Sequence, residues 1–406
     1  MKILVVTNLF HPDRGGGASV FSDMCYGLVE RGHDVTVFST YPYYPEWQNK
    51  SGAKAWRTAT ETINGVRVVR FGVYIPTNPS KFIPRVMFEL SFTLSLMRSL
   101  FYFRRYDAVM VYCPVLSSVL YGAIRRIFYR EPMWLNVQDI PADAAAAAGI
   151  SKNRFANRLS QMAQKFLFNR AVLWSSIAPK MIQRLSELRT RNQPIHLVPN
   201  FLNTSMAEVI AAHAPKINRP VSQPIKLLYG GNIGKKQGLL EFCKQLSKSK
   251  LAFQFTIHGN GGEAPSLKQW VEASGDSRFR FGEFLDEAGF VNALFESDLF
   301  VITEKSGAGA SFIPSKLIPC MATGTPVLCV CDPDGPLGTE VGQYGLGVTS
   351  HWNELDELLD RLTELSHDQQ RYRQLQQNAI ERSEAYRRDP VIDFVERELT
   401  LLTQKK

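Results

Sequence analysis

Two glycine-rich turns, each placed between an apolar strand pattern and a helical pattern, limit the folds open to this chain. The second turn, 230–238, reads Gly-Gly-Asn-Ile-Gly-Lys-Lys-Gln-Gly and follows the apolar run 225–229. The first turn, 14–17, reads Arg-Gly-Gly-Gly and follows the apolar run 1–10. Glycine lets the backbone approach an anion, the N–H groups of the following helix point at it, and lysine adds charge. The second turn therefore predicts a phosphate-binding site.

The length and the pattern of the chain predict two domains. At 406 residues the chain exceeds the size at which one core keeps growing. Apolar strands alternate with amphipathic helices throughout, which is typical of doubly wound α/β domains with ligands at the carboxyl ends of strands. The Pro-rich segment 213–224 is interpreted as a linker. We expect domains at 1–212 and 213–387, facing across a cleft, with a helix in 388–406 returning to the first.

The cysteine pattern and the first residues argue against a disulfide framework, a zinc site and a signal peptide. The six cysteines are scattered without a Cys-x-x-Cys pair, which argues against a disulfide framework and a zinc site and favours reduced core residues. No metal and no cofactor are expected. The apolar run 3–6 breaks at Thr7 and reaches Pro12 without a small-residue cleavage site, so it is interpreted as a strand rather than a signal peptide.

Positive charge is concentrated in the first half of the chain. Residues 1–200 contain 25 Lys and Arg and 12 Asp and Glu, a net charge of +13, whereas residues 201–406 carry −4. The runs 81–105 and 121–130 mix basic with large apolar residues. This composition suits a helix lying on an anionic bilayer at the inner face of the cell membrane. A helix packed on the sheet with solvated arginines is the alternative, and nucleic acid is disfavoured because no recognition module accompanies the charge.

Seven motifs carry a family resemblance over nearly the whole chain. They are the first glycine turn, Tyr43-Tyr44-Pro45-Glu46-Trp47-Gln48, Val137-Gln138-Asp139, Val198-Pro199-Asn200, residues 231–239, Pro314-Ser315-Lys316-Leu317 and residues 321–327. In this order they resemble the GT-B glycosyltransferases of family 4, and more narrowly the bacterial colanic-acid and N-acetylfucosamine transferases. The resemblance implies a nucleotide diphosphate sugar bound mainly by the C-terminal domain, an acceptor bound by the N-terminal domain, retention of configuration and no metal requirement.

On the donor side, transfer of the sugar leaves negative charge on the departing diphosphate, which the protein must neutralise. Lys236 and Lys316 are the candidates. Lys316 precedes an expected helix, 317–322, whose N-terminus adds on the order of 0.3–1 kcal/mol of anion stabilisation. Ser315 is either a helix cap or a phosphate hydrogen-bond donor. The remaining donor-binding candidates are Gly16, Gly17, Gly231, Asn232, Lys235, Gln237 and Glu283.

This chain departs from the family pattern at two places. Asn232 and Gln237 stand where most relatives have Arg and Lys, so Lys235 or Lys236 must replace them. The two glutamates of the family signature fall on Ser311 and Pro319. Glu304, at a strand end upstream, is a candidate substitute for one of them, and a surface glutamate is the alternative.

On the acceptor side, Asp139 follows the strand 133–138 and could orient or deprotonate an acceptor hydroxyl, with a helix N-cap as the alternative. Gln138 precedes it, where relatives often have histidine, and cannot act as a base. Arg14 and the first glycine turn would border both substrates. Tyr44 and Trp47 either stack on sugar faces or pack a Pro-rich loop.

Two other patterns are set aside. Asp332-Pro333-Asp334 resembles a metal-binding Asp-x-Asp but lies in a Pro/Gly turn after a strand. The first glycine turn lacks the Gly-x-Gly-x-x-Gly spacing of a dinucleotide-binding dehydrogenase.

The sequence predicts a hexosyltransferase acting on a UDP-linked sugar and on a glycan or polyprenyl-diphosphate-linked acceptor in surface polysaccharide biosynthesis. A nucleotide-sugar epimerase of the same fold remains an alternative. So does a catalytically inactive sugar-nucleotide-binding scaffold, which the absent glutamates motivate.

Overall fold

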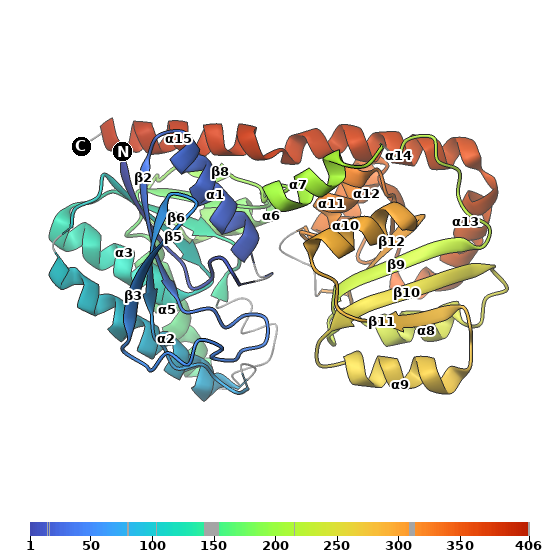
Figure 1. The fold of residues 1–406 in the computed structure, drawn as a ribbon, viewed down its shortest axis with the longest axis horizontal. Helices are drawn as coiled ribbons and strands as arrows, with labels where there is room; N and C mark the ends of the chain where they lie inside the picture. The colour runs from blue at the N-terminus through green and yellow to red at the C-terminus, as the bar shows by residue number, and fades with distance from the viewer. Residues whose placement is uncertain are drawn as a thin grey trace. The chain divides into compact units, whose positions relative to one another are not determined.

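The computed structural model describes residues 1–13, 15, 17–78, 81–102, 104–141, 154–214, 216–307 and 313–404. The chain divides into two compact units, which are described separately. Unit 1 contains residues 1–200 and 388–406, and unit 2 contains residues 201–387. Both are α/β units built on a sheet with helices packed against it (Figure 1), as the alternation of patterns predicts.

Unit 1 is built on an eight-stranded sheet in the order β3-β4-β2-β1-β5-β6-β7-β8. Its strands are β1 (Lys2–Val6), β2 (Asp34–Thr40), β3 (Thr58–Ile63), β4 (Val66–Phe71), β5 (Ala108–Cys113), β6 (Met133–Val137), β7 (Leu173–Ser176) and β8 (Ile195–Leu197). All neighbours are parallel except β3 and β4. The apolar pattern does not indicate β3, because this edge strand is largely exposed and carries alternating threonines.

The helices of unit 1 follow its strands. They are α1 (Ala18–Glu30), α2 (Phe82–Arg98), η1 (Ser99–Tyr102), α3 (Leu116–Tyr129), α5 (Arg154–Phe168), α6 (Pro179–Leu188) and α15 (Arg388–Gln404). Gly17 begins α1 from a left-handed conformation, φ +89°, which an L side chain rarely adopts. The following helix therefore starts directly at the glycine turn.

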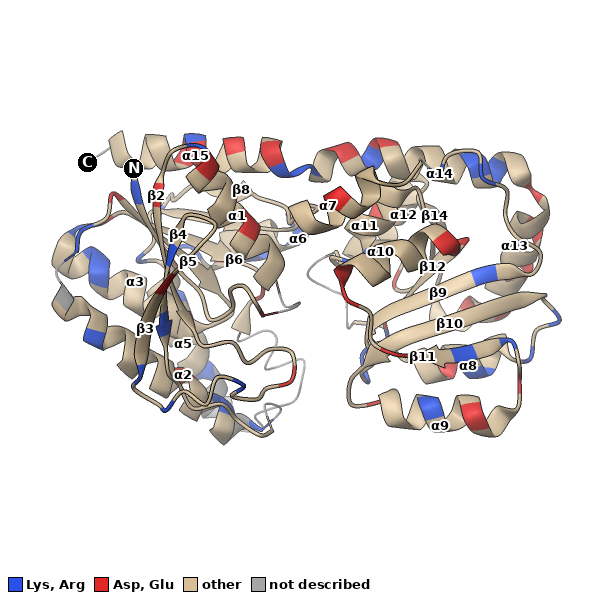
Figure 2. Cartoon of the chain, in the orientation of Figure 1, with Lys and Arg blue, Asp and Glu red and all other residues tan. Residues whose placement is uncertain are grey.

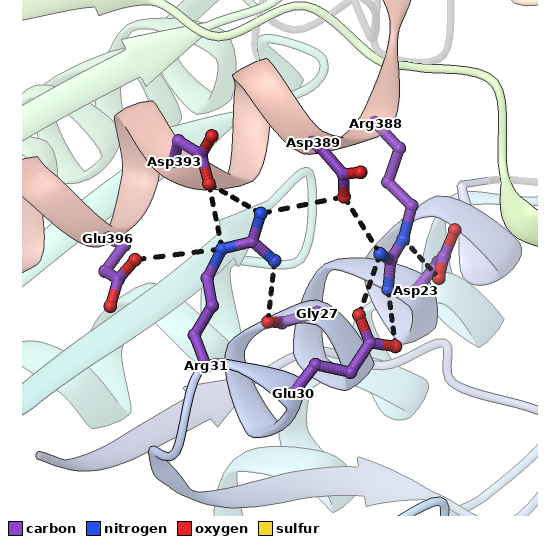
Figure 3. A network of polar contacts seen from close by, with 8 residues as sticks. All are labelled: Asp23, Gly27, Glu30, Arg31, Arg388, Asp389, Asp393 and Glu396. Carbon is purple, nitrogen blue, oxygen red and sulfur yellow. Dashed lines mark hydrogen bonds and ion pairs between the residues drawn. The ribbon is translucent and has the colours of Figure 1, made fainter.

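Helix α15 packs along α1 through a polar network and a close apolar contact (Figure 3). Arg31 donates to Asp393 at 2.5 Å, and Arg388 donates to Asp23 and Glu30, each at 2.9 Å. Between these arginines a Cβ added to Gly27 would lie 2.2 Å from Ile392 Cδ1. The glycine thus lets the two helices approach, and the arginines hold the C-terminal segment in unit 1.

Unit 2 is built on a six-stranded parallel sheet in the order β11-β10-β9-β12-β13-β14. Its strands are β9 (Ile225–Asn232), β10 (Phe253–Asn260), β11 (Phe279–Gly282), β12 (Leu299–Thr303), β13 (Val327–Val330) and β14 (Gly347–Ser350). Its helices are α7 (Thr204–Ala211), α8 (Leu239–Leu246), α9 (Ala264–Ser274), α10 (Glu287–Glu296), α11 (Leu317–Thr323), α12 (Pro336–Tyr344), η2 (Trp352–Glu354), α13 (Leu355–His367), α14 (Gln369–Ser383) and η3 (Glu384–Tyr386).

The boundary between the units lies after Asn200, twelve residues earlier than the sequence pattern places it. Helix α7 packs on α10 and therefore belongs to unit 2. Segment 213–224 is not a free linker in its described part, because Lys216 donates to the carbonyls of Leu294, at 2.8 Å, and Ser297. A lysine buried in this way anchors the segment to the helix α10 side of unit 2, which composition alone does not reveal.

The six cysteines are all buried with free thiols, which confirms their assignment to the core. Among the helices of the described residues, we find none with the length and apolarity to cross a membrane.

Candidate functional site

The strand order places the second glycine turn at a switch point of the unit 2 sheet. From β9 the chain proceeds outward through β10 and β11, then returns to the other side of β9 with β12, β13 and β14. Ligands of open parallel sheets bind outside the carboxyl ends of the strands at such a point. The turn after β9 and the segment after β12 meet there, since the Lys305 N–H donates to the carbonyl of Lys236 at 2.8 Å.

Lys316 lies directly over the glycine turn. A Cβ added to Gly231, whose φ is +124°, would lie 2.2 Å from the Lys316 ammonium nitrogen. The same ammonium lies 4.9 Å from the centre of the Tyr229 ring, within range of a cation–π interaction. Gly231 is therefore required both for its backbone conformation and because the lysine occupies the space of a side chain. The two motifs, which the sequence analysis assigns to the same diphosphate, are thus in contact.

Two titratable groups of this site have shifted pKa values. Burial lowers the pKa of Lys316 to about 8, and interactions with Cys320 and Glu304 partly oppose that shift. Burial, and secondarily the charge of Asp332, raise the pKa of Glu304 to about 7, against the influence of Lys316 and Lys236. Near neutral pH the lysine is thus charged while the glutamate is close to half-protonated. An anionic ligand would complete the neutralisation of the two lysines.

Asn232 and Gln237, which stand where most relatives have Arg and Lys, stabilise the turn itself. The Gln237 side-chain oxygen accepts hydrogen bonds from the Gly234 N–H at 3.0 Å and from the Asn232 amide at 3.4 Å. The side chains of Lys235 and Lys236 are exposed at the turn. Asn232 and Gln237 therefore stabilise the turn without adding charge, and Lys235 and Lys236 supply the charge instead.

The segment after β12 is held by residues that follow β13 and β14. The Glu304 carbonyl accepts from Trp352 Nε1 at 2.7 Å, and Asp332 accepts from the Gly307 N–H at 2.7 Å. His351 lies 3.1 Å from the Ser306 hydroxyl and 3.4 Å from Asp332. Asp332, part of the pattern set aside as a turn, thus positions the segment that carries Glu304. Sequence reasoning missed this role because the partners are 25 and 19 residues apart.

The remaining donor candidates of unit 2 lie nearby or on the same edge. The Glu283 side chain is exposed, and its carbonyl accepts from His258 Nδ1 at 2.7 Å, at the ends of β11 and β10. Ser315 is exposed, and the N-cap position of α11 falls on Lys316, so Ser315 does not take the cap role. Pro319 is buried within α11, and Ser311 lies outside the described residues.

In unit 1 a buried carboxylate anchors the edge where β1 and β2 end. Asp13 Oδ1 accepts from the N–H groups of Tyr43 and Tyr44, each at 2.8 Å. Burial raises the pKa of Asp13, although these hydrogen bonds oppose the shift. A Cβ added to Gly15 would lie 3.5 Å from the Tyr44 ring. The glycine turn and Tyr44 are therefore neighbours. Sequence reasoning missed Asp13, whose position beside the glycine turn was the available signal.

The other aromatic candidate has a packing role. Trp47 packs edge-on against Tyr43 and Phe88, with ring centroids 5.0 and 5.9 Å apart, and Arg85 lies 5.1 Å over its ring. The loop-packing alternative describes this residue. Arg14 and Gly16 lie outside the described residues, and Gly17 begins α1.

Asp139 and Gln138 follow β6, at the edge of the sheet where the first glycine turn also lies. The Gln138 amide donates to Asn136 at 2.7 Å, and Asp139 Oδ1 accepts from the Ile140 N–H at 2.9 Å. Residues 142–153 lie outside the described part of the chain, so the helix-cap alternative for Asp139 stays a prediction. Unit 1 thus presents a carboxylate and an aromatic hydroxyl on one sheet edge, groups that can hydrogen-bond a hydroxylated ligand.

Comparisons with known proteins assign both parts of the chain. The family described as "Glycosyl transferase 4-like domain" matches residues 15–200, and the family described as "Glycosyl transferases group 1" matches residues 212–382. WcaI of Escherichia coli (strain K12), whose name assigns it to colanic acid biosynthesis as a glycosyl transferase, is 27% identical over 339 residues, 80% of this chain and 82% of that protein.

Solved structures show the same fold. Sucrose-phosphate synthase from Thermosynechococcus elongatus superposes with a TM-score of 0.73 at 16% identity, covering 100% of both chains. HepE of Anabaena, solved in complex with UDP and glucose, superposes with a TM-score of 0.68 at 14% identity, covering 98% of this chain and 99% of that one.

Proposed function

The chain belongs to the GT-B glycosyltransferases of family 4, and from this membership we propose a specific reaction. The protein transfers a hexosyl group, with retention of configuration, from a UDP-linked sugar to a glycan or a polyprenyl-diphosphate-linked acceptor in surface polysaccharide biosynthesis. The name of WcaI supports the assignment to polysaccharide biosynthesis, and the UDP and glucose bound to HepE support the donor class.

The contact between Lys316 and Gly231 carries the donor proposal. When the bond from the sugar to the diphosphate breaks, negative charge develops on the leaving oxygen. A lysine held over the glycine turn, with Lys236 at the same turn, provides positive charge where a diphosphate would lie. Lys316 would donate charge-assisted hydrogen bonds to the diphosphate, and the turn would supply backbone N–H groups. We propose that this lysine charge allows transfer without a metal ion.

Glu304 is proposed as the carboxylate that contacts the donor in place of the two family glutamates. It lies at the carboxyl end of β12, close enough for the charges of Lys316 and Lys236 to lower its pKa. A half-protonated carboxyl group can both donate and accept, which suits a sugar or ribose hydroxyl. The neighbouring Asp332 and His351 hold its segment in place.

The acceptor is proposed to bind unit 1, at the edge carrying Asp139, Gln138 and Tyr44. Asp139 would orient the acceptor hydroxyl, and the leaving diphosphate would take its proton, as expected when both act on one face of the sugar. The carrier-linked acceptor implies that the enzyme works at the inner face of the cell membrane.

A donor panel tests the proposal. Purified protein is incubated with UDP- and GDP-linked sugars, EDTA and a lipid extract containing acceptor, and released nucleoside diphosphate is measured. Release from one UDP-sugar that requires the extract would support metal-independent transfer. UDP binding without release, with an acceptor known to be competent, would instead support an inactive scaffold.

Lys316→Ala is the matched variant for the donor site. Because it removes charge-assisted hydrogen bonds worth about 1.5–3 kcal/mol, UDP affinity should fall about 10- to 150-fold, with turnover falling alongside. Lys244→Ala, on the exposed face of α8, is the control. Equal UDP affinity in the two variants, measured by calorimetry, would contradict the role of Lys316.

A further inference from the structure

Three neighbouring helices of unit 1 leave large apolar side chains exposed. Helix α2 packs on α3, and α3 packs on α5. The exposed apolar residues of these helices and of η1 are Ile83, Val86, Met87, Leu90, Leu94, Phe101, Ile127, Phe128, Leu159, Met162 and Phe166. We call this set the three-helix face. Most of the large exposed apolar side chains of the described residues belong to it.

Helix α2 has two apolar stripes on opposite sides. Phe88, Phe92 and Leu96 are fully buried and pack in the core of unit 1. The second stripe consists of side chains that are 46–70% exposed: Ile83, Met87, Leu90 and Leu94. They follow one another at intervals of four, three and four residues, which places them on one side of the helix. A helix that only covers a sheet needs one apolar stripe, so the second stripe requires another explanation. The structure therefore shows the sheet-packed helix that the sequence offered as an alternative, with an additional apolar outer side, and the position on a bilayer stays a prediction.

Helix α5 repeats this arrangement, which sequence reasoning did not detect. Leu159, Met162 and Phe166 lie three and four residues apart and are 58–61% exposed. At the end of α3, Ile127 and Phe128 are exposed to 63% and 73%. Exposed apolar residues are ordinary when scattered singly, but a set of this size on adjacent helices marks an interaction surface.

The charge around the three-helix face has one sign. The only acidic residue in α2, α3 and α5 is Glu89, which is turned inward to accept from the Ser117 N–H at 3.1 Å. In Figure 2 the ribbon of α3 carries blue and no red. Exposed or partly exposed basic residues of these helices and their ends include Lys81, Arg85, Arg98, Arg126, Arg130, Arg158, Lys165 and Arg170. Burial and the nearby charges of Arg191 and Arg170 lower the pKa of Arg126, as expected where cations gather.

We propose that the three-helix face docks on the surface of an anionic lipid bilayer. Its apolar side chains would enter the boundary between headgroups and acyl chains, and the arginines and Lys165 would contact lipid phosphates. Charge complementarity selects this occupant, because the apolar residues are bordered by cations without exposed acidic residues on the same helices. The proposal depends on neither the donor nor the acceptor assigned above.

Vesicle sedimentation tests this proposal. The full chain should pellet with vesicles of phosphatidylglycerol and phosphatidylcholine, and less with phosphatidylcholine alone or at high ionic strength. The combined variant Leu90→Ser, Phe128→Ser and Phe166→Ser should bind the anionic vesicles about tenfold more weakly or worse. The variant Arg158→Gln and Lys165→Gln should lose part of the preference for anionic lipid.

Matched controls separate docking from folding and from the proposed reaction. Leu401→Ser, an exposed apolar residue of α15 outside the face, should bind vesicles as the unchanged protein does. Thermal unfolding and calorimetric UDP affinity should be unchanged in the triple variant, because its residues lie on the surface of unit 1, whereas the lysine turn belongs to unit 2. Loss of vesicle binding with UDP binding intact would support docking whatever the enzyme's substrates are.

Three results would overturn the proposal. One is vesicle binding by the triple variant equal to that of the unchanged protein. Another is binding of the unchanged protein without preference for anionic lipid. The third is concentration-dependent self-association of the unchanged protein in sedimentation velocity that the triple variant abolishes, which would assign the face to a second copy of the chain.

Discussion

Both units begin with a strand, a glycine turn and a helix, yet the buried side chains beside the two turns carry groups of opposite charge. In unit 1 the turn after β1 lies beside a buried carboxylate, Asp13, which binds the backbone of the neighbouring loop. In unit 2 the turn after β9 lies beneath the ammonium of Lys316. The buried neighbour of the first turn is thus a carboxylate, whereas that of the second is an ammonium, which favours an anion there. The comparison teaches that glycine spacing makes room for a ligand, while the charge brought in from distant residues selects it.

The two buried side chains beside the turns, Asp13 and Lys316, also differ in what they stabilise. Asp13 is buried and satisfies two backbone N–H groups, so it is part of the fold. Lys316 is packed against a tyrosine ring and a glycine backbone, with a pKa lowered to about 8, so its charge is held at a cost. We expect substitution of the first to reduce stability and substitution around the second to reduce ligand affinity.

The largest expected effect is on stability in unit 1. Asp13→Ala leaves the N–H groups of Tyr43 and Tyr44 unsatisfied in a buried loop, at a cost of about 3 kcal/mol in the free energy of unfolding. Gln237→Ala removes the corresponding side-chain acceptor of the second turn, which is partly exposed, and should cost less than about 1 kcal/mol. Chemical unfolding of both variants measures the difference. Equal losses would show that the two turns are anchored alike.

The next effect is on ligand affinity in unit 2. An alanine methyl at Gly231 would displace the flexible end of Lys316, so UDP should bind about 50-fold more weakly while the unit stays folded. At Gly15, φ +77°, the methyl would contact the Tyr44 ring at an ordinary distance, leaving only backbone strain of about 1 kcal/mol.

Calorimetry with UDP on the two alanine variants sharpens the contrast. Gly275→Ala, at φ +62° with open space around the new methyl, controls for the strain of a left-handed conformation such as that of Gly15. If Gly15→Ala weakens UDP binding as much as Gly231→Ala does, the proposed difference between the turns is wrong.

The sequence predicted the fold because strand and helix periodicity are local properties. Both glycine turns, the alternation of elements and the buried cysteines follow from patterns within a dozen residues. The edge strand β3 and the position of α7 escaped, because an exposed threonine-rich strand lacks an apolar run and α7 belongs with a helix far along the chain.

The residues of the candidate site were proposed from the sequence, but the contacts between them were not. Lys316 and the turn at Gly231 were both candidates, but their contact spans 85 residues and depends on the strand order, which no local pattern specifies. Asp13 and His351 were missed for the same reason, since each acts through partners that only the folded sheet brings near. Lone polar residues beside a glycine turn are weak signals until their partners are known.

The smallest expected effect is on the pH dependence of stability and of ligand binding, and it distinguishes the carboxyl group of Glu304 from that of Asp13. Burial raises the pKa of Glu304 from 4.5 to about 7, so its protonated form is favoured in the folded state. The resulting stabilisation is complete below pH 4.5 and is lost as the pH rises to 7. Glu304→Gln has no carboxyl group to titrate and so does not lose this stabilisation. Between pH 4.5 and 7 its free energy of unfolding should therefore rise by about 1–2 kcal/mol relative to that of the unchanged protein.

Ligand binding should report the same titration. Above pH 7 the Glu304 carboxylate competes with the diphosphate for Lys316, so UDP affinity of the unchanged protein should fall as the pH rises from 6.5. In Glu304→Gln the fall should follow only the loss of the Lys316 proton, whose pKa of about 8 in the unchanged protein includes a raising contribution from Glu304 that the variant lacks. Asp13→Asn, which keeps the acceptor oxygen in the other unit, should leave the profile of UDP binding unchanged. A profile altered by Asp13→Asn and not by Glu304→Gln would assign the titrating carboxylate to the first turn and reverse the comparison.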